Sequence, residues 1–464
     1  MTVIASTSPI PPDARAAHRQ LSPAAERLLE HLLDHPEQAA QLAGYEKGLP
    51  PWMPEYVTWP TLVDARRVAE MERVAVGVCK LVKAVPAVVF GGDMGAIGAY
   101  YGFDPIMLAA AFSVRNYMNT TVARGDFIDT PGGLMCCEMN LAANVGRWEH
   151  GFWSGRYLQN DVLMDFCARE GISPGSRDPL LTFCEHMVDD ALESGVTREG
   201  GELNVMVVLD WPITEGARRQ AGEVYADLLR RTGRGVTGQL LLYTAPVENP
   251  TRRGPDLYMG DQRVHVYYAH TGQGFPVQVL RGQVMGRIRA YNGMLTRMWL
   301  DKRNIALLSE NEGLEAWTEE ERELIRGHIP WTRTLSPRTT TWRGAEVQFP
   351  GFLLDHRDEM VLKHGLGNGG KQVHVGRYLA PDAWEARVRE AVEEGGWIVQ
   401  ERVDSRPYFY PPQPGAAPVA HTVVWGLFCT GQRYAGGFLR MLPPGAGDGV
   451  VGTNGSYESA ILEI

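Results

Sequence analysis

The chain lacks several features that would assign it to a common class of protein. Its 464 residues include six cysteines but no Cys-x-x-Cys pair, which disfavours a zinc ribbon and a disulfide framework. The net charge is −10, so we expect no general binding to nucleic acid or to an anionic membrane. No apolar run reaches membrane-spanning length, and the N-terminus has no basic segment followed by an apolar one. We therefore expect a cytoplasmic protein.

The length and an ordinary globular composition predict two to four structural units with a sizeable core. Helical periodicity marks residues 21–42 and 61–85. From about residue 203 the pattern changes to a buried-type strand at 203–210, a charged helix at 214–232 and another strand at 239–243. This alternation predicts a small parallel α/β domain.

Further elements follow from apolar periodicity and from turn and capping residues. Thr318 and Glu321 form a capping-box pattern at the start of a helix near 317–328. The other expected elements are helices at 107–118, 161–194 and 381–394, strands near 121–128, 134–139, 397–403, 420–429 and 432–442, a hairpin at 257–268 and a proline-rich surface loop at 408–418.

A glycine-rich loop lies between two apolar runs near the C-terminus. Lys363 precedes four glycines within residues 365–370, and a strand-like run at 373–375 follows. Glycines let backbone N–H groups approach phosphate oxygens, and a lysine adds a compact positive charge. The stretch also fits the start of a P-loop, but Gln372 replaces the metal-binding Ser or Thr and no helix follows. We interpret it as a hairpin lid over phosphates; the alternative is a glycine-rich turn with an incidental lysine.

Carboxylates and an amide gather in a second segment. Two neighbouring strands, joined by a turn at 129–133, would bring Asp126 close to Glu138 and Asn140. Glu138 and Asn140 must share a face, because strand residues two apart point the same way. Such oxygen ligands suit Mg²⁺. The alternative is a hairpin with polar residues on its solvent face.

Together the two segments resemble the circularly permuted ATP-grasp family, in particular the glutathionylspermidine synthase-like carboxylate–amine ligases. Arg-x-Asp, a turn and Glu-x-Asn are similar to the family's magnesium strand pair, whereas the lysine, glycine loop and Gln-Glu-x-Val are similar to its nucleotide half. The two halves occur here in the reverse of the ordinary order. The resemblance covers about residues 115–464 and includes further motifs at 300–304, 328–332, 397–401, 436–440 and 452–455.

The resemblance implies an α+β fold, namely a circularly permuted ATP-grasp fold with a small pre-ATP-grasp α/β domain and an N-terminal helical region. The implied parts are the helical region at 1–114, the magnesium-binding half at 115–202, the α/β substrate domain at 203–300 and the nucleotide-binding half at 301–464. The N-terminal region would complete the substrate cleft or mediate formation of a homodimer.

The resemblance also assigns roles to individual residues. Arg124 and Arg440 would stabilise charge at the transferring phosphoryl group, with a structural ion pair as the alternative for each. Ala142 stands where some members carry an arginine, which leaves the acceptor chemistry open. The implied Mg²⁺ ligands are Asp126, Glu138 and Asn140. The implied ATP-binding residues are Lys302, Lys363, Gly365, Gly367, Gly369, Gly370, Lys371, Gln400, Glu401, Val403 and Asn454. The alternative for Lys302 is a solvated helix lysine, and the alternative for Lys371 is a solvent-exposed side chain.

The implied activity joins a carboxylate to an amine, through an acyl phosphate, at the expense of ATP. Both substrates would be small molecules or peptides, in natural-product or peptide tailoring. Two other functions stay open: an ATP-grasp phosphotransferase that forms no amide, and a nucleotide-binding interaction protein without turnover. The sequence does not identify either substrate.

Overall fold

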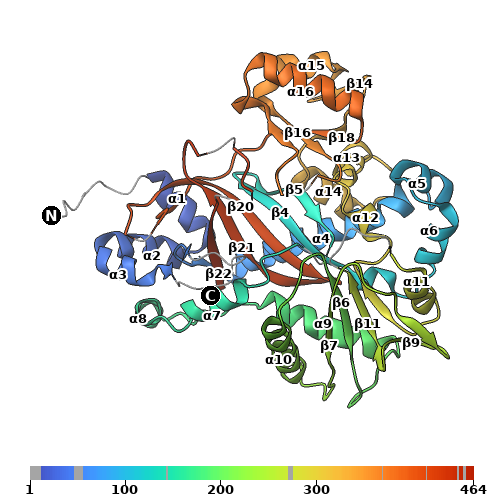
Figure 1. Cartoon of the computed structure of the whole chain (residues 1–464). Helices are drawn as coiled ribbons and strands as arrows, with labels where there is room; N and C mark the ends of the chain where they lie inside the picture. Colours follow the sequence, from blue (N-terminus) through green and yellow to red (C-terminus); the bar gives the residue numbers. More distant parts are fainter. Residues whose placement is uncertain are drawn as a thin grey trace.

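A computed structural model describes residues 12–45, 56–142, 145–269, 275–367, 369–413, 415–446, 449–452 and 456–464. It is a mixed α+β structure with several sheets, which confirms the α+β part of the predicted fold (Figure 1). No helix in the described part combines the length and apolar character needed to cross a bilayer.

The N-terminal helices are divided by proline positions. The predicted helical stretch at 21–42 forms the end of α1 (Pro12–Leu21), then α2 (Pro23–Asp34) and α3 (Pro36–Leu42). Ser22 caps α2, because its side chain accepts a hydrogen bond from the Ala25 N–H. A proline opens each helix, where its missing N–H costs nothing.

The largest sheet joins strands from both ends of the chain (Figure 1). Its strand order is β3-β22-β21-β20-β4-β5, and β19 pairs with β20 at one side. All neighbours are antiparallel except β3 and β22. The bounds are β3 (Thr61–Val63), β4 (Val122–Thr130), β5 (Gly133–Asn140), β19 (Tyr408–Tyr410), β20 (Val419–Thr430), β21 (Arg433–Leu442) and β22 (Tyr457–Glu463).

Two predictions in this region are wrong. The stretch at 61–85 is not entirely helical: residues 61–63 form β3, and α4 (Ala65–Val88) begins after its cap Asp64 and packs against β20 and β5. The stretch at 408–418 is not only a surface loop, because Tyr408 and Tyr410 are fully buried in β19. Proline-rich composition concealed this short strand, and β22 was not predicted.

The predicted parallel pairing of strands after residue 203 is confirmed. β6 (Val205–Leu209), β7 (Leu240–Thr244), β11 (Val266–Ala269) and β12 (Arg289–Tyr291) form a parallel sheet in the order β12-β11-β6-β7. α9 (Pro179–Glu193) and α10 (Glu215–Arg231) share a core with it. The predicted hairpin is β9 (Asp256–Met259) with β10 (Gln262–Val264), and β8 (Thr251–Arg253) joins them.

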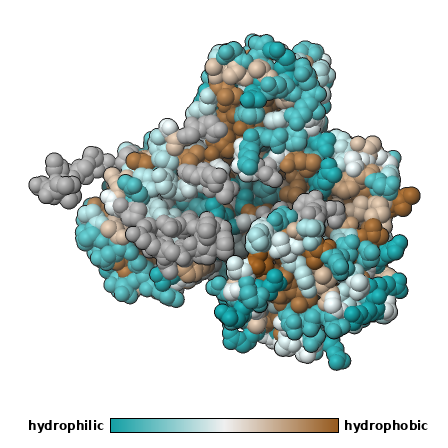
Figure 2. Space-filling view, viewed as in Figure 1, coloured by the Kyte–Doolittle hydropathy of each residue, from teal (hydrophilic) through white to brown (hydrophobic). Residues whose placement is uncertain are grey.

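A second antiparallel sheet forms the upper lobe in Figure 1 and Figure 2, in the order β13-β18-β16-β17. Its strands are β13 (Thr332–Thr334), β16 (Met360–His364), β17 (Val373–Val375) and β18 (Trp397–Glu401). The predicted helix α16 (Pro381–Glu394) contributes Trp384 to the core beneath this sheet. The other face of the sheet is left for the site described below. The glycine loop connects β16 to β17, as predicted.

The remaining elements support these sheets. α14 (Glu319–His328) starts with the predicted capping box, and the predicted helices at 107–118 and 161–194 are each shorter and interrupted. The others are β1 (Gly44–Tyr45), β2 (Tyr56–Val57), α5 (Met94–Tyr101), α6 (Pro105–Phe112), the 3₁₀ helix η1 (Tyr117–Thr120), α7 (His150–Tyr157), α8 (Asp161–Glu170), α11 (Val277–Val284), α12 (Thr296–Trp299), α13 (Arg303–Glu310), β14 (Arg338–Trp342), β15 (Ala345–Phe349), α15 (Gly351–Asp355), η2 (Arg357–Glu359) and η3 (Gly376–Tyr378).

His18 makes the fold sensitive to acid. It is buried between α1 and β19, where its Nε2 accepts a hydrogen bond from the Phe409 N–H, and burial lowers its pKa to about 4. Because the unfolded histidine binds a proton more readily, stability is complete above pH 6.5 and falls as the pH drops toward 4. We expect the wild type to lose about 2 kcal/mol from pH 7 to pH 5 through this group. His18→Gln should flatten the denaturation profile over that range, and an unchanged slope would contradict this account.

Candidate functional site

A cavity of about 510 Å³ lies between the upper sheet and the β4–β5 hairpin. Side chains from β4, β5, β16, β17, β18, β20 and β21 line it, so segments about 300 residues apart in sequence meet there. Its volume is within the range of small-molecule and cofactor sites. The described part of the N-terminal region contributes no lining residue, and within 203–300 only Leu300 does so.

The cavity concentrates positive charge in a protein whose overall charge is negative. Six basic and four acidic side chains line it. They are Arg124, Lys302, Lys363, Arg377, Arg402 and Arg440, with Asp126, Glu138, Glu401 and Asp404. A partly enclosed site with this balance favours an anionic ligand.

Lys363 connects the two walls of the cavity. It projects from β16 and is only 7% exposed. Its ammonium donates to the Cys137 carbonyl of β5 at 3.0 Å and to Gln400 Oε1 of β18 at 2.6 Å. An ammonium has three donors, so one N–H is left without a partner among the described residues. Lys363 can therefore present a hydrogen bond to a ligand in the cavity.

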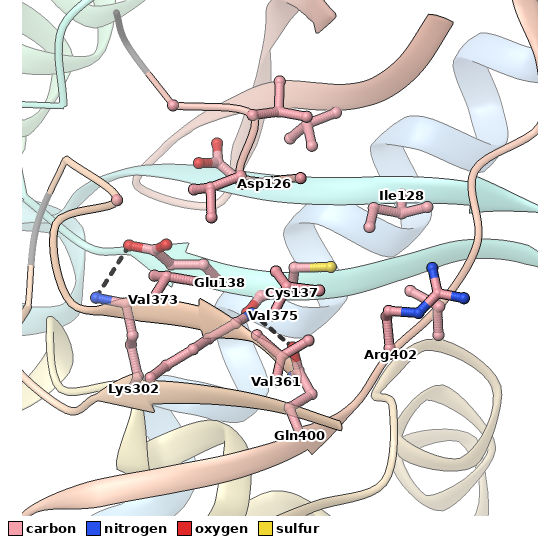
Figure 3. A pocket seen from close by; sticks show the side chains of 18 of the residues that line it. Asp126, Ile128, Cys137, Glu138, Lys302, Val361, Val373, Val375, Gln400 and Arg402 are labelled. Carbon is pink, nitrogen blue, oxygen red and sulfur yellow. Dashed lines mark hydrogen bonds and ion pairs between the residues drawn. The ribbon is translucent and has the colours of Figure 1, made fainter. Parts of the chain in front are cut away.

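Lys302, just before α13, also joins the walls. Its ammonium donates to the Gly367 carbonyl of the glycine loop and lies 3.2 Å from Glu138 Oε1 on β5 (Figure 3). Lys302 is buried, whereas the Glu138 side chain is 23% exposed. The glycine loop and the β4–β5 hairpin are thus tied together by one cation.

Asp126 is held by two arginines. Arg124 makes a bidentate contact with its carboxylate at 2.8 and 3.1 Å, and Arg440 Nη2 donates to Oδ2 at 2.6 Å. Burial opposes the charge on Asp126, but the arginines outweigh it and keep the carboxyl pKa below its ordinary value. The strand pairing places Asp126 opposite Glu138 and Arg124 opposite Asn140, because a β-bulge shifts the register by one residue between Phe127 and Asp126.

A second buried acid, Glu458, lies beside Arg440 and offsets part of the positive charge of the two arginines. Glu458 on β22 stands directly opposite Arg440 on β21. Its carboxylate lies 2.9 Å from His150 Nε2 and 2.6 Å from Arg147 Nε. Burial opposes its charge, but these partners hold the pKa of Glu458 below its ordinary value. The sequence contained no sign of this group, because Glu458 meets Arg440 only when β22 pairs with β21.

The glycines of the loop do not share one role. Gly367, Gly369 and Gly370 line the cavity. Gly365 does not: a Cβ there would lie 2.6 Å from Asp301 Oδ1, so it permits close packing instead. Gly369 and Gly370 have φ of +62° and +76°, which side chains rarely adopt. A Cβ on Gly370 would lie 3.0 Å from Val450, so the loop approaches residues 449–452 across the cavity.

The cavity has two chemically different ends (Figure 3). Asp126, Glu138 and Lys302 lie toward one end, and Ile128 and Arg402 lie toward the other. Val361, Val373 and Val375 line the wall formed by the upper sheet, together with the predicted residues Gln400, Glu401 and Val403. The Glu401 carboxylate is paired with Arg343.

Two predicted residues, Gly365 and Lys371, do not line the cavity, and Lys371 is exposed. The predicted residue Asn454 lies outside the described residues. Sequence reasoning also missed several lining residues. The alternation of β16 and β17 could have identified Val361, Val373 and Val375, because they share a face with Lys363. Arg377, Tyr378 and Arg402 carried no such signal.

Comparison of the chain with protein-family models and with curated proteins gives no match. Within the described ranges, no three His, Cys, Asp or Glu side chains are grouped as candidate metal ligands. The predicted set contains only two acids, together with the amide of Asn140, and all three line the cavity.

The ion pairs of the site predict unequal effects on stability. Asp126→Asn leaves two buried arginines without their anion, and we expect the free energy of unfolding to fall by about 3 kcal/mol. Glu138→Gln should cost clearly less, because Glu138 is partly exposed and a glutamine oxygen can still accept from Lys302. Urea denaturation of both variants measures the difference. Equal losses would contradict the central place of Asp126 in the arginine cluster.

Proposed function

We propose that this chain is an ATP-dependent carboxylate–amine ligase with a circularly permuted ATP-grasp fold. The observation that supports this most is the convergence of Lys302 and Lys363 with the carboxylates of Asp126 and Glu138 on one cavity, beneath a glycine loop. These groups come from widely separated parts of the sequence. Such an arrangement suits a nucleotide held between two sheets, with its phosphates among lysines and glycine N–H groups.

The two ends of the cavity suggest how the nucleotide lies. The triphosphate would take the end with Lys302 and Glu138, where the glycine loop passes. The base would lie toward the apolar side chains of Ile128, Val361 and Val375. Val403 follows the end of β18, where regular strand pairing stops and backbone groups can meet the edge of a base.

The residues present fit a magnesium ion. Asp126 already receives three N–H donors, so little of its oxygen capacity is left. Glu138 and Asn140 are better placed as ligands, and Mg²⁺ in nucleotide sites needs only one or two carboxylates besides phosphates and water. When bound, Mg²⁺ would neutralise charge on the phosphates. Lys302, paired with Glu138 here, would turn to the phosphates.

The chemistry requires an activated acid, because a carboxylate is a poor acylating agent. The substrate carboxylate attacks the γ-phosphorus of ATP, which gives an acyl phosphate and ADP. An amine then attacks the acyl carbon and releases phosphate, which leaves an amide. Arg124 and Arg440 are placed to stabilise charge near the transferring group. The glycine loop, held against residues 449–452, would exclude water that hydrolyses acyl phosphates.

The same nucleotide residues would serve a phosphotransferase that forms no amide. The two functions differ in what they require for ADP release: the ligase needs a carboxylate and an amine, whereas the phosphotransferase needs only its acceptor. A protein without turnover would bind nucleotide and release no ADP under either condition.

Nucleotide binding provides the first test. Lys363→Met should weaken binding of MgATP roughly 10- to 100-fold, because a charged hydrogen bond to phosphate is lost. Lys371→Met is the matched control, since Lys371 carries the same charge on the same hairpin but lies outside the cavity. Calorimetric titration measures both. Equal losses in the two variants would contradict the placement of the phosphates.

Turnover provides the second test. A screen of amino acids and short peptides for ADP release, with mass spectrometry of the products, should yield an amide and one ADP for each bond formed. ¹⁸O from the labelled carboxylate should appear in phosphate. Glu138→Ala should abolish turnover, and persistence of turnover in that variant would reject Glu138 as a metal ligand.

A further inference from the structure

Residues 328–332 connect two walls of the cavity. They form one of the motifs noted in the sequence, where no role was assigned to its individual residues. His328 Nδ1 lies 2.7 Å from the Leu134 carbonyl on β5. Trp331 accepts a hydrogen bond from the Glu401 N–H, and Thr332 pairs directly opposite Gln400 on β18. The segment therefore lies behind the residues that hold Lys363.

A chain of three buried side chains runs from this segment to the cavity. Thr332 is 0% exposed, Gln400 is 2% exposed and Lys363 is 7% exposed. Gln400 Nε2 donates to Thr332 Oγ1 at 3.1 Å, and Gln400 Oε1 accepts from Lys363 Nζ at 2.6 Å. The two ends of one amide thus have different partners.

Hydrogen-bond directions allow one orientation of this amide. The Thr332 hydroxyl donates its only proton to the Pro330 carbonyl at 2.8 Å, so toward Gln400 it can only accept. Lys363 has no acceptor, so it requires the oxygen of Gln400. A reversed amide would set its NH₂ against the ammonium, and the Thr332 hydroxyl could donate to the amide oxygen only by giving up the Pro330 carbonyl. Both ends therefore select the observed orientation.

We propose that Thr332 is a positioning residue for nucleotide binding, which acts through Gln400 to orient the Lys363 ammonium. With the Gln400 oxygen fixed and the Cys137 carbonyl as second acceptor, two of the three Lys363 donors are committed and the third is available to the cavity. Thr332 itself does not line the cavity. The inference rests on the proposed role of Lys363 at the phosphates.

The test compares MgATP affinity in variants of the full chain. Thr332→Val removes the acceptor at nearly constant volume and should weaken binding roughly tenfold. Thr332→Ser keeps the hydroxyl and should stay within about threefold of the wild type. Thr430→Val is the control, because Thr430 is also fully buried but its hydroxyl has no hydrogen-bond partner in the described structure. It should leave the affinity unchanged.

A double variant separates positioning from a general effect on stability. In a Gln400→Leu background, Thr332→Val should cause no further loss of affinity, since the amide that connects Thr332 to Lys363 is gone. Melting temperatures of all variants are measured in parallel, and Thr332→Ala serves if Thr332→Val does not fold. Wild-type affinity in Thr332→Val, or additive losses in the double variant, would overturn the inference alone. Failure of the wild type to bind MgATP would overturn the proposed function as well.

Discussion

Ion pairs and charged hydrogen bonds between the two facing sheets are the constraint on which the site depends. Lys363 reaches from the upper sheet to the β5 backbone, and Lys302 reaches from the start of α13 to Glu138 on the same strand. A buried ammonium without partners is costly, so these contacts fix how the upper sheet lies over the β4–β5 hairpin. The geometry of the cavity therefore depends on the pairing of these buried charges.

The ion pairs of the site also determine which contacts a ligand must replace. Asp126 is committed to Arg124 and Arg440, whereas Glu138 is paired with a single lysine and is partly exposed. An anionic ligand that takes Lys302 would free Glu138, and a divalent cation could then replace the lost positive charge. In the proposed function, nucleotide and metal would therefore exchange for an existing ion pair and would favour each other's binding.

The sequence indicated this region because its signals are local. A clear turn predicted the β4–β5 hairpin, and the glycine loop between two apolar runs marked β16 and β17. The register shift between Asp126 and Phe127, which sets Asp126 opposite Glu138, carried no signal in the sequence. Elements and contacts that depend on partners distant in the sequence left no such local signal. β19 has three residues and β22 has seven, and no periodicity marks either strand. Both form because neighbouring strands are there to pair with. The partners of Glu458 and Thr332 can be identified only when β21 lies beside β22 and β18 lies beside β13. Lys371 is an example of a local signal that was misleading, because it belongs to the glycine-rich motif but does not line the cavity.

The most direct measurement of the central claim is a crystal structure of the protein with Mg²⁺ and a non-hydrolysable ATP analogue. The account predicts the triphosphate beside Lys302 and Lys363 under the glycine loop, the base toward Ile128, and Glu138 released from Lys302 to the metal. An analogue bound elsewhere, or a cavity in which Lys302 and Glu138 stay paired at saturating nucleotide, would contradict it.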